Sequence, residues 1–184
     1  MSAWLSSLIT DYLHHPRRWL AGMALASLGL LAFGLYLQHV VGLNPCPMCI
    51  VQRYCLTGVA LAAAFGALWR GRPGLALASL LGVVLAGFGA FTAARQSWLQ
   101  WYPPQVASCG RDFYGMIESL PLQRAIPMIF RGSGDCTAID WTFLGGSIAN
   151  WSFLCFVTFL GLFAVMALRA VRVPGGKQRG RASE

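Results

Sequence analysis

Residues Trp19–Gln52 read WLAGMALASLGLLAFGLYLQHVVGLNPCPMCIVQ, and none of them is Asp, Glu, Lys or Arg. A helix needs about 20 mainly apolar residues to cross the hydrocarbon core of a bilayer. The stretch therefore holds one complete transmembrane helix, then a short segment that Pro45 and Pro47 stiffen, and then the start of a second helix. The motif C-P-M-C at 46–49 lies where the first apolar run ends and the second begins.

Three further stretches lack acidic and basic residues: Tyr54–Trp69, Pro73–Ala94 and Trp141–Leu168. The whole chain is 57% hydrophobic and only 11% charged, whereas a soluble domain carries about 25% charged residues. The second run reaches membrane-spanning length only by starting near Ile50. We therefore predict an all-α membrane protein, a four-helix transmembrane bundle that forms a single integral domain over residues 1–184. The predicted helices cover residues 19–41, 50–69, 74–94 and 147–168.

The N-terminus admits a second interpretation, a cleaved signal peptide. The apolar run from Trp19 is too long for such a peptide, whose apolar region has about 7–15 residues. No small-x-small cleavage site ends the run before Cys46. We expect the first helix to be retained and to follow an amphipathic lead-in, residues 1–18, that lies on the membrane.

The basic residues predict the orientation of the bundle, because cytoplasmic flanks carry the excess of Lys and Arg. One set of flanks holds nine of the 14 basic residues: Arg17, Arg18, Arg70, Arg72, Arg169, Arg172, Lys177, Arg179 and Arg181. The opposite set holds the other five: Arg53, Arg95, Arg111, Arg124 and Arg131. We expect both termini, including the tail 169–184, to be cytoplasmic. The two cysteine-bearing loops, 42–49 and 95–146, should face outward.

The formal net charge of +8 raises the question of nucleic-acid binding. Basic patches can bind phosphates, but the positive charges of this chain lie beside the helix ends. There they set the orientation and contact anionic lipid headgroups. We expect membrane lipid as a partner and no nucleic acid.

The long outer loop is rich in apolar residues and is broken by Pro103, Pro104, Pro121 and Pro127. Roughly 50 residues could bury only a small core of their own. Trp and Tyr are favoured at the headgroup level of a bilayer. The loop pattern therefore favours short segments resting in the headgroup region over a separate soluble domain.

Four of the six cysteines lie in the predicted outer loops: Cys46, Cys49, Cys109 and Cys136. Disulfides persist in an oxidising outer compartment, so two structural disulfides are one interpretation. For Cys46 and Cys49 this is unfavourable, because a two-residue spacer closes a very small loop and stabilises little. Closely spaced pairs serve thiol–disulfide exchange, in which one thiol attacks and the other resolves. For Cys109 and Cys136 a structural role and a redox role both stay open.

Arg53 is a candidate binding residue beside the cysteine motif. Cys49 falls in the first turn of the second predicted helix, where unpaired N–H groups and the helix dipole favour an anion. Arg53 follows one turn later on the same face. An arginine just inside a transmembrane helix is costly without a partner. That partner would be a thiolate at Cys49 or a polar ligand at the helix mouth; the alternative is an arginine that extends to the headgroups.

A zinc site is the other common use of four cysteines. Zinc sites usually show two close pairs in the sequence, whereas Cys109 and Cys136 are far apart. We expect no metal. Cys55 and Cys155 lie inside predicted helices and are most simply small buried apolar residues.

With these residues, the chain resembles the DsbB family of bacterial disulfide-bond-forming membrane proteins. The likeness runs from the first predicted helix through the fourth, and its motifs are specific in combination. The matching pieces are Gln38-His39-Val40, Pro45-Cys46-Pro47-Met48-Cys49-Ile50 with Arg53, Tyr102-Pro103 ahead of Cys109, Ser133-Gly134-Asp135-Cys136, Trp141 and Phe143-Leu144-Gly145.

The resemblance implies a quinone-dependent protein thiol oxidase of the bacterial inner membrane, with its outward loops in the periplasm. It implies that Cys109 and Cys136 form a disulfide, which a soluble thioredoxin-like partner of the DsbA type attacks at Cys109. Cys136 would then attack Cys46. Cys49, released as a thiolate beside Arg53, would reduce bound ubiquinone or menaquinone. The quinone supplies the oxidising power, and the protein holds the reacting groups together.

Two residues depart from the family pattern. Gln96 stands where some relatives have a histidine, so no histidine contact with the quinone is implied, and Gln52 precedes Arg53 where an acidic residue can occur. A competing hypothesis from another class is a structural membrane protein whose disulfides only fasten its outer loops. A third hypothesis is an oxidase that serves one dedicated partner with a narrow substrate.

Overall fold

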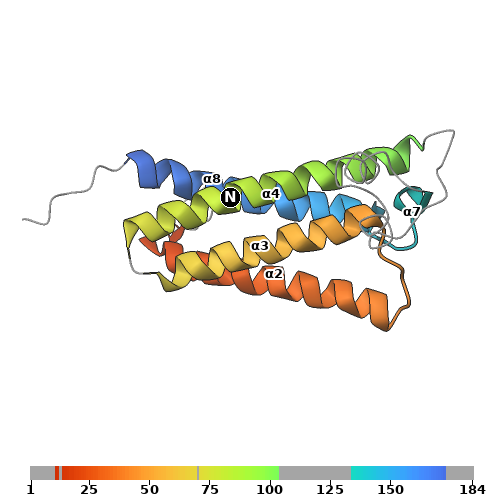
Figure 1. The fold of residues 1–184 in the computed structure, drawn as a ribbon, viewed down its shortest axis with the longest axis horizontal. Coiled ribbons are helices and arrows are strands. Elements are labelled where there is room, and N and C mark those ends of the chain that lie inside the picture. The colour runs from red at the N-terminus through yellow and green to blue at the C-terminus, as the bar shows by residue number, and fades with distance from the viewer. Residues whose placement is uncertain (1–10, 13, 70, 104–133, 173–184) are drawn as a thin grey trace, which may run out of the picture.

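The computed structural model describes residues 11–12, 14–69, 71–103 and 134–172. Four long helices lie side by side along one direction (Figure 1). They are α2 (Pro16–His39), α3 (Pro47–Leu68), α4 (Arg72–Trp101) and α8 (Ile148–Arg172). Each is long and apolar enough to cross a membrane. The prediction of an all-α, four-helix membrane fold is confirmed. Residues 1–10 of the predicted lead-in, 104–133 of the outer loop and 173–184 of the tail lie outside the described residues.

The helix limits differ from the predicted ones mainly at the end of α4. α2 and α3 each start a few residues early on a proline, whose missing N–H would have no partner in a first turn. α4 continues to Trp101, although the prediction ended it at Ala94. The reason is that Gln96 and Gln100, which resemble loop residues in the sequence, find hydrogen-bond partners inside the protein.

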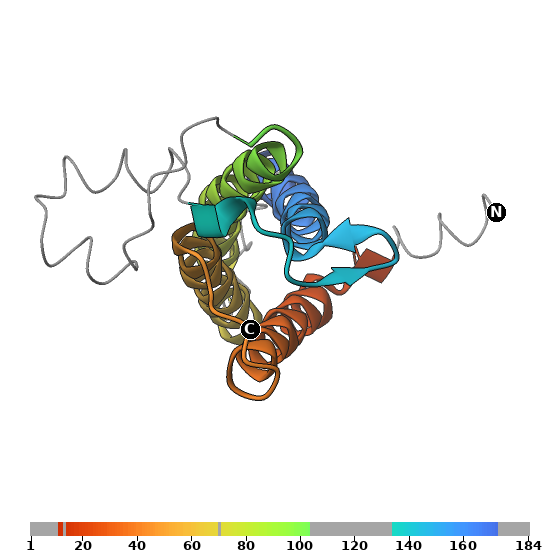
Figure 2. The ribbon, with the colours of Figure 1, turned by 90° about the vertical axis from the view of Figure 1, so that its right-hand side faces the viewer.

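Three short elements lie at the end of the bundle where α4 ends and α3 begins (Figure 2). They are α7 (Gly134–Thr137) and the antiparallel strands β1 (Thr142–Phe143) and β2 (Gly146–Ser147), in a region predicted only as loop. Leu144 and Gly145 join the strands with φ angles of 49° and 80°. Two consecutive positive φ values are what a two-residue type I′ turn requires.

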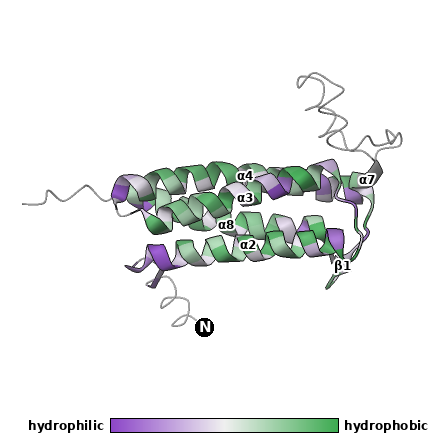
Figure 3. Ribbon diagram, turned by 60° about the horizontal axis from the view of Figure 1, so that its bottom comes forward, coloured by the Kyte–Doolittle hydropathy of each residue, from purple (hydrophilic) through white to green (hydrophobic). Residues whose placement is uncertain are grey.

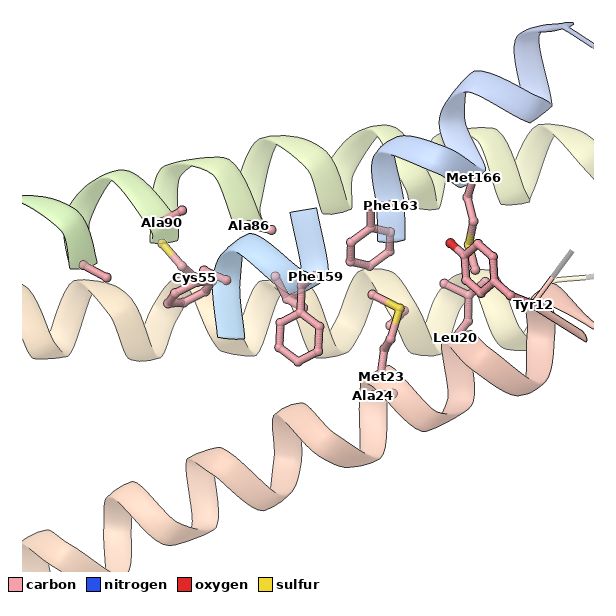
Figure 4. Packing of buried hydrophobic residues seen from close by; sticks show 14 residues of the cluster. Tyr12, Leu20, Met23, Ala24, Cys55, Ala86, Ala90, Phe159, Phe163 and Met166 are labelled. Atoms are coloured by element: carbon pink, nitrogen blue, oxygen red, sulfur yellow. The ribbon is translucent and has the colours of Figure 1, made fainter. Parts of the chain in front are cut away.

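The helices pack around an apolar core (Figure 4), in which Leu20, Val59 and Phe163 are fully buried. Small residues on α4 let its neighbours α3 and α8 approach closely. They are Gly74, Ala78, Gly82 and Ala86. The packing is tight, because a Cβ atom added to Gly82 would lie 2.4 Å from the ring of Phe163.

The outer surface of the bundle is apolar as well, and hydrophilic residues gather toward its two ends (Figure 3). Large apolar side chains on it are more than half exposed: Leu25, Leu61, Leu80, Val84 and Leu154. A contiguous exposed apolar surface of this kind is typical of contact with a membrane. These side chains would promote aggregation in water, and they are favourable in contact with the hydrocarbon core of a membrane.

α2 diverges from the other helices toward its C-terminal end (Figures 1 and 4). Leu20 and Met23, near its start, are buried in the common core, whereas Phe33 and Tyr36, near its end, are exposed. The divergence leaves a cavity beside α2 at the end of the bundle that carries the cysteines.

Candidate redox site

Cys46 and Cys49 lie at the start of α3. Cys46 is the N-cap residue, and its sulfur accepts a hydrogen bond from the backbone N–H of Cys49 at 3.3 Å. The two Sγ atoms are 2.7 Å apart, which is about 0.7 Å more than the length of a disulfide bond. The structure places Cys49 in the first helical turn, as the sequence predicted.

α7 brings Cys136 to the same place from the far end of the long loop. Its side chain is fully buried in a small cluster with Cys46, Met48 and Leu99. A hydrogen bond between the thiols of Cys136 and Cys46 raises the pKa of Cys46, and the hydrogen bond with Cys49 and burial raise it further. These interactions favour the protonated thiol of Cys46 over its thiolate. Three of the four cysteines singled out by the sequence are in one place.

The other cysteines lie elsewhere. Cys109 is outside the described residues, so its pairing with Cys136 stays a prediction. Cys55 is buried in the apolar core of the bundle. Cys155, on α8, is half-buried and lines the cavity.

Two glutamines complete the surroundings of the cysteine pair. Nε2 of Gln96 lies 3.3 Å from Sγ of Cys49 and 3.4 Å from Sγ of Cys46. Oε1 of Gln96 accepts a hydrogen bond from Nε2 of Gln52 at 2.7 Å. The sequence marked these positions only as departures from a family pattern. A polar residue inside an apolar run, Gln52, was the one available signal that the pair has a role.

Arg53 has its partners on α2 and not at the cysteine sulfurs. Its Nη2 donates to the backbone carbonyl of Gly34 at 3.0 Å, and its Nη1 donates to the side-chain carbonyl of Gln38. The guanidinium lies against the backbone of α2, and a Cβ atom at Gly34 would lie in ordinary contact with it, 3.6 Å from Nε. Arg53 therefore finds its hydrogen-bond partners within the protein, on α2, and its role as a binding residue stays a prediction.

The cavity between the diverging α2 and the rest of the bundle has a volume of about 630 Å³. Its polar wall contains Cys46, Cys49, Gln52, Arg53 and Gln96. Apolar side chains of α2 and α8 form much of the remaining lining, together with residues from the segments 43–45 and 138–143. The cavity therefore joins an apolar space, of the kind a lipid-like molecule enters, to the sulfur atoms of the cysteine pair.

Trp141, which precedes β1, and Phe143, in the hairpin formed by β1 and β2, line the cavity. Trp141 contacts Phe33 of α2 edge to face, with ring centroids 5.8 Å apart, and stacks on Phe143 at 6.1 Å. The indole N–H of Trp151, on α8, donates to the backbone carbonyl of Phe143 at 2.9 Å. The hairpin thus connects α2 with α8 where the helices themselves diverge.

The described part of the chain contains no group of three His, Cys, Asp or Glu side chains arranged to hold a metal ion. The site brings three cysteine sulfur atoms together. Adjacent thiols, a third thiol in contact and hydrogen-bond donors around them are suited to thiol–disulfide exchange.

Comparison with known proteins identifies relatives over most of the chain. Residues 16–166 match the family described as disulfide bond formation protein DsbB. The chain is 66% identical to the disulfide bond formation protein B of Paracidovorax citrulli over 161 residues, which cover 88% of this chain and 92% of that protein. It is 64% identical to the protein of the same name from Verminephrobacter eiseniae over 167 residues, covering 91% and 93% of the two chains.

Proposed function

The chain belongs to the DsbB family of disulfide bond formation proteins, and on this basis we propose that it oxidises a periplasmic thioredoxin-like protein of the DsbA type. It passes the electrons to membrane quinone, ubiquinone or menaquinone, and so sustains disulfide bond formation in exported proteins. The observation that carries the proposal is the contact of Cys136 with Cys46, beside Cys49 and at the wall of an apolar cavity.

The first exchange takes place at a disulfide between Cys109 and Cys136. A thiolate of the partner attacks the sulfur of Cys109, a mixed disulfide forms, and the electron pair of the broken bond leaves on Cys136. The partner's second thiolate then attacks the partner's own sulfur in the mixed disulfide. This completes the partner's disulfide and leaves Cys109 as a thiolate, so two electrons have moved to the chain.

The second exchange moves the electrons inward. The Cys136 thiolate attacks Sγ of Cys46, and the Cys46–Cys49 bond breaks with its electron pair on Cys49. The contact between Cys136 and Cys46 supports this step, because groups already in contact need little further ordering. Cys109 then attacks Cys136, which restores the outer disulfide and leaves Cys46 and Cys49 reduced.

The cavity has the properties that a quinone site needs. Its volume is within the range of about 300–1,000 Å³ found for small-molecule sites. A guanidinium carries five N–H donors. Within the described residues Arg53 uses two of them on α2, and we propose that another donates to a carbonyl oxygen of the quinone. The quinone, when bound, supplies the oxidising power for the pair Cys46–Cys49.

We propose the orientation in the membrane that the basic residues predict. Both termini and the connection between α3 and α4 would be cytoplasmic, and residues 42–49 and 95–146 would be periplasmic, as one integral domain in the bacterial inner membrane. This orientation puts the cysteine end of the bundle in the compartment where disulfides persist.

The test uses the purified chain in detergent, a reduced DsbA-type protein, and soluble ubiquinone and menaquinone analogues. Loss of quinone absorbance should match oxidation of the partner's thiols. Cys46→Ser and Cys49→Ser should abolish it, Cys109→Ser should abolish the mixed disulfide, and Cys55→Ala, in the core, should retain turnover. Turnover by Cys46→Ser would contradict the relay. No quinone loss with any analogue would favour the structural alternative, in which serine variants lose stability and have no activity to lose.

A further inference from the structure

Gln96 contacts both sulfur atoms of the cysteine pair, and the resemblance to the DsbB family assigns no function to this contact. Resting on the proposed function, we infer that the side-chain N–H of Gln96 donates to the sulfur of Cys49 and stabilises the charge that this sulfur receives when the Cys46–Cys49 bond breaks. Gln96 touches a reacting atom and is a catalytic residue in that sense. Gln52, which acts through Gln96, is a positioning residue.

The orientation of the Gln96 amide follows from Gln52. An amide has a donor end and an acceptor end, and Gln52 occupies the acceptor end at 2.7 Å. The donor end then faces Sγ of Cys49 at 3.3 Å, and the distance from that sulfur to Oε1 of Gln96 is longer, at 3.7 Å. With both amides reversed, a carbonyl oxygen would face the sulfurs and would oppose a negative charge there.

Burial makes this hydrogen bond strong. Only 4% of the surface of Gln96 and 6% of that of Gln52 is exposed. Water therefore competes little for the amide, and a hydrogen bond to a charged group is stronger in such surroundings than in water. The hydrogen bond between the two amides offsets part of the cost of burying them.

The nearby cation does not take this role. Arg53 directs its guanidinium to Gly34 and Gln38 on α2. Among the described residues, the side-chain donors placed against the sulfur of Cys49 are the thiol of Cys46 and the amide of Gln96. Cys46 carries no thiol hydrogen while it is bonded to Cys49 or to Cys136, so it cannot donate during the exchange. The amide of Gln96 then remains as the donor for the departing electron pair.

The same amide reaches both sulfurs of the pair. Its Nε2 lies 3.4 Å from Sγ of Cys46 and 3.3 Å from Sγ of Cys49. Either sulfur that becomes negative during exchange therefore finds the donor in place. A neutral donor also releases the charge when the electrons move on, because it forms no ion pair with the sulfur.

The experiment measures the thiolate of Cys49 directly in the reduced full-length protein. Thiolate absorbance at 240 nm is recorded against pH for each variant and for the same variant carrying Cys49→Ser, and the difference isolates Cys49. Gln96→Met, a substitution of similar shape, should shift this pH profile so that about tenfold less thiolate is present at a given pH, equivalent to about 1.4 kcal/mol. Gln52→Met should shift it in the same direction by a smaller factor.

A double variant tests whether Gln52 acts through Gln96, and a variant of the neighbouring Ser97 serves as the control. Gln52→Met combined with Gln96→Met should shift the profile no further than Gln96→Met alone, because Gln52 acts only through Gln96. Ser97→Ala is the matched control, since Ser97 is buried next to Gln96 and its hydroxyl has no hydrogen-bond partner among the described residues. It should leave the profile unchanged.

In quinone turnover, Gln96→Met should lower kcat with little change in the KM for the partner. An unchanged thiolate profile, or more thiolate in Gln96→Met, would overturn the inference, the latter by showing that a carbonyl faces the sulfur. If Gln96→Met fails to fold, the sign of the shift in Gln52→Met decides. The absorbance needs neither quinone nor partner, so failure of the proposed function would appear separately, as a wild-type chain that reduces no quinone.

Discussion

Different interactions hold the helices together in the two halves of the bundle, although the same four helices run through both. In the half around Leu20, Val59 and Phe163, which we call the packed half, the helices are held together by tight apolar contacts. In the half around the cavity, which we call the open half, α2 diverges, and side-chain hydrogen bonds and aromatic contacts connect the elements. The packed half holds the four helices together, and the open half contains the cavity beside the cysteine pair.

α4 shows how one helix serves both purposes. Its first half presents glycine and alanine to its neighbours, as at Gly82 and Ala86, and its last turns present Gln96 and Gln100. Apolar burial alone does not drive helices together in a membrane, so close packing of small residues has to do so. Because the packed half positions the helices, the open half can contain buried polar groups without losing the fold.

The largest expected effect is the loss of a side chain from the packed half. Phe163→Ala should lower the free energy of unfolding by about 3–5 kcal/mol, because the fully buried ring leaves a cavity that its tight surroundings cannot fill. Phe33→Ala, in the open half, should cost clearly less because Phe33 is already 45% exposed. Thermal unfolding in detergent, followed by circular dichroism, compares the two. Equal losses would mean that the halves are packed alike.

A smaller effect is expected from adding one methyl group. Gly82→Ala forces a Cβ atom to within 2.4 Å of the ring of Phe163, and overpacking of this kind costs about 1–3 kcal/mol. Gly29→Ala places the same methyl group where no atom lies within 4 Å. It should leave stability unchanged or slightly raised, since alanine favours a helix. A melting temperature of Gly82→Ala equal to that of Gly29→Ala would refute the tight packing.

In the open half, Arg53→Met should affect function more than stability. The variant loses the hydrogen bonds to Gly34 and Gln38 that connect α3 with α2 beside the cavity, together with the donors that we propose for a quinone. We expect the KM for the quinone analogue to rise about tenfold, which corresponds to about 1.4 kcal/mol. Gln38→Met removes one bond on α2 and keeps the guanidinium, so its effect should be intermediate. If both variants leave the quinone KM unchanged, Arg53 is only a structural link.

The smallest expected effect on stability comes from Tyr12, at the edge of the packed half far from the cavity. The hydroxyl of buried Tyr12 donates to the backbone carbonyl of Leu162, and Tyr12→Phe should cost about 1 kcal/mol. Burial raises the pKa of Tyr12 to about 12, with Arg169 partly opposing the shift. Folding therefore favours the neutral phenol, and its contribution is complete below pH 10 and lost as the pH rises through about 12.

An alkaline titration tests this sign. Unfolding of the wild-type chain should gain a pH-dependent component between pH 10 and 12 that Tyr12→Phe lacks. Tyrosinate absorbance at 295 nm identifies the late-titrating group, and Tyr36→Phe, on an exposed side chain, serves as the control. An identical alkaline response in Tyr12→Phe would mean that the phenol is accessible to water.

The fold could be predicted from charge-free runs because a bilayer admits few alternatives to apolar helices. The end of α4 could not, since Gln96 and Gln100 are polar and only the folded structure shows that Gln52 and Ser147 satisfy them. The short hairpin at Leu144 could not be predicted from the sequence either. Its turn depends on two positive φ values, one of them at a residue that seldom adopts them.

The site was predictable where chemistry is local in the sequence. The spacing of Cys46 and Cys49 pointed to exchange, and resemblance pointed to Cys136. The contact between Gln52 and Gln96 was not predictable, because it depends on how α3 and α4 are rotated against each other. The partner of Arg53 was left open for the same reason, although Gln38 stood in a motif already singled out.

The N-cap of α3 is also a potential spectroscopic probe. The backbone N–H of Cys49 donates to the sulfur of Cys46, so the electron density on that sulfur acts on an ordinary amide proton. The chemical shift of this proton should differ between a thiol, a bond to Cys49 and a bond to Cys136. Nuclear magnetic resonance of a single ¹⁵N-labelled amide would therefore follow the proposed relay through its cycle, without a dye, a substituted residue or a bound reporter.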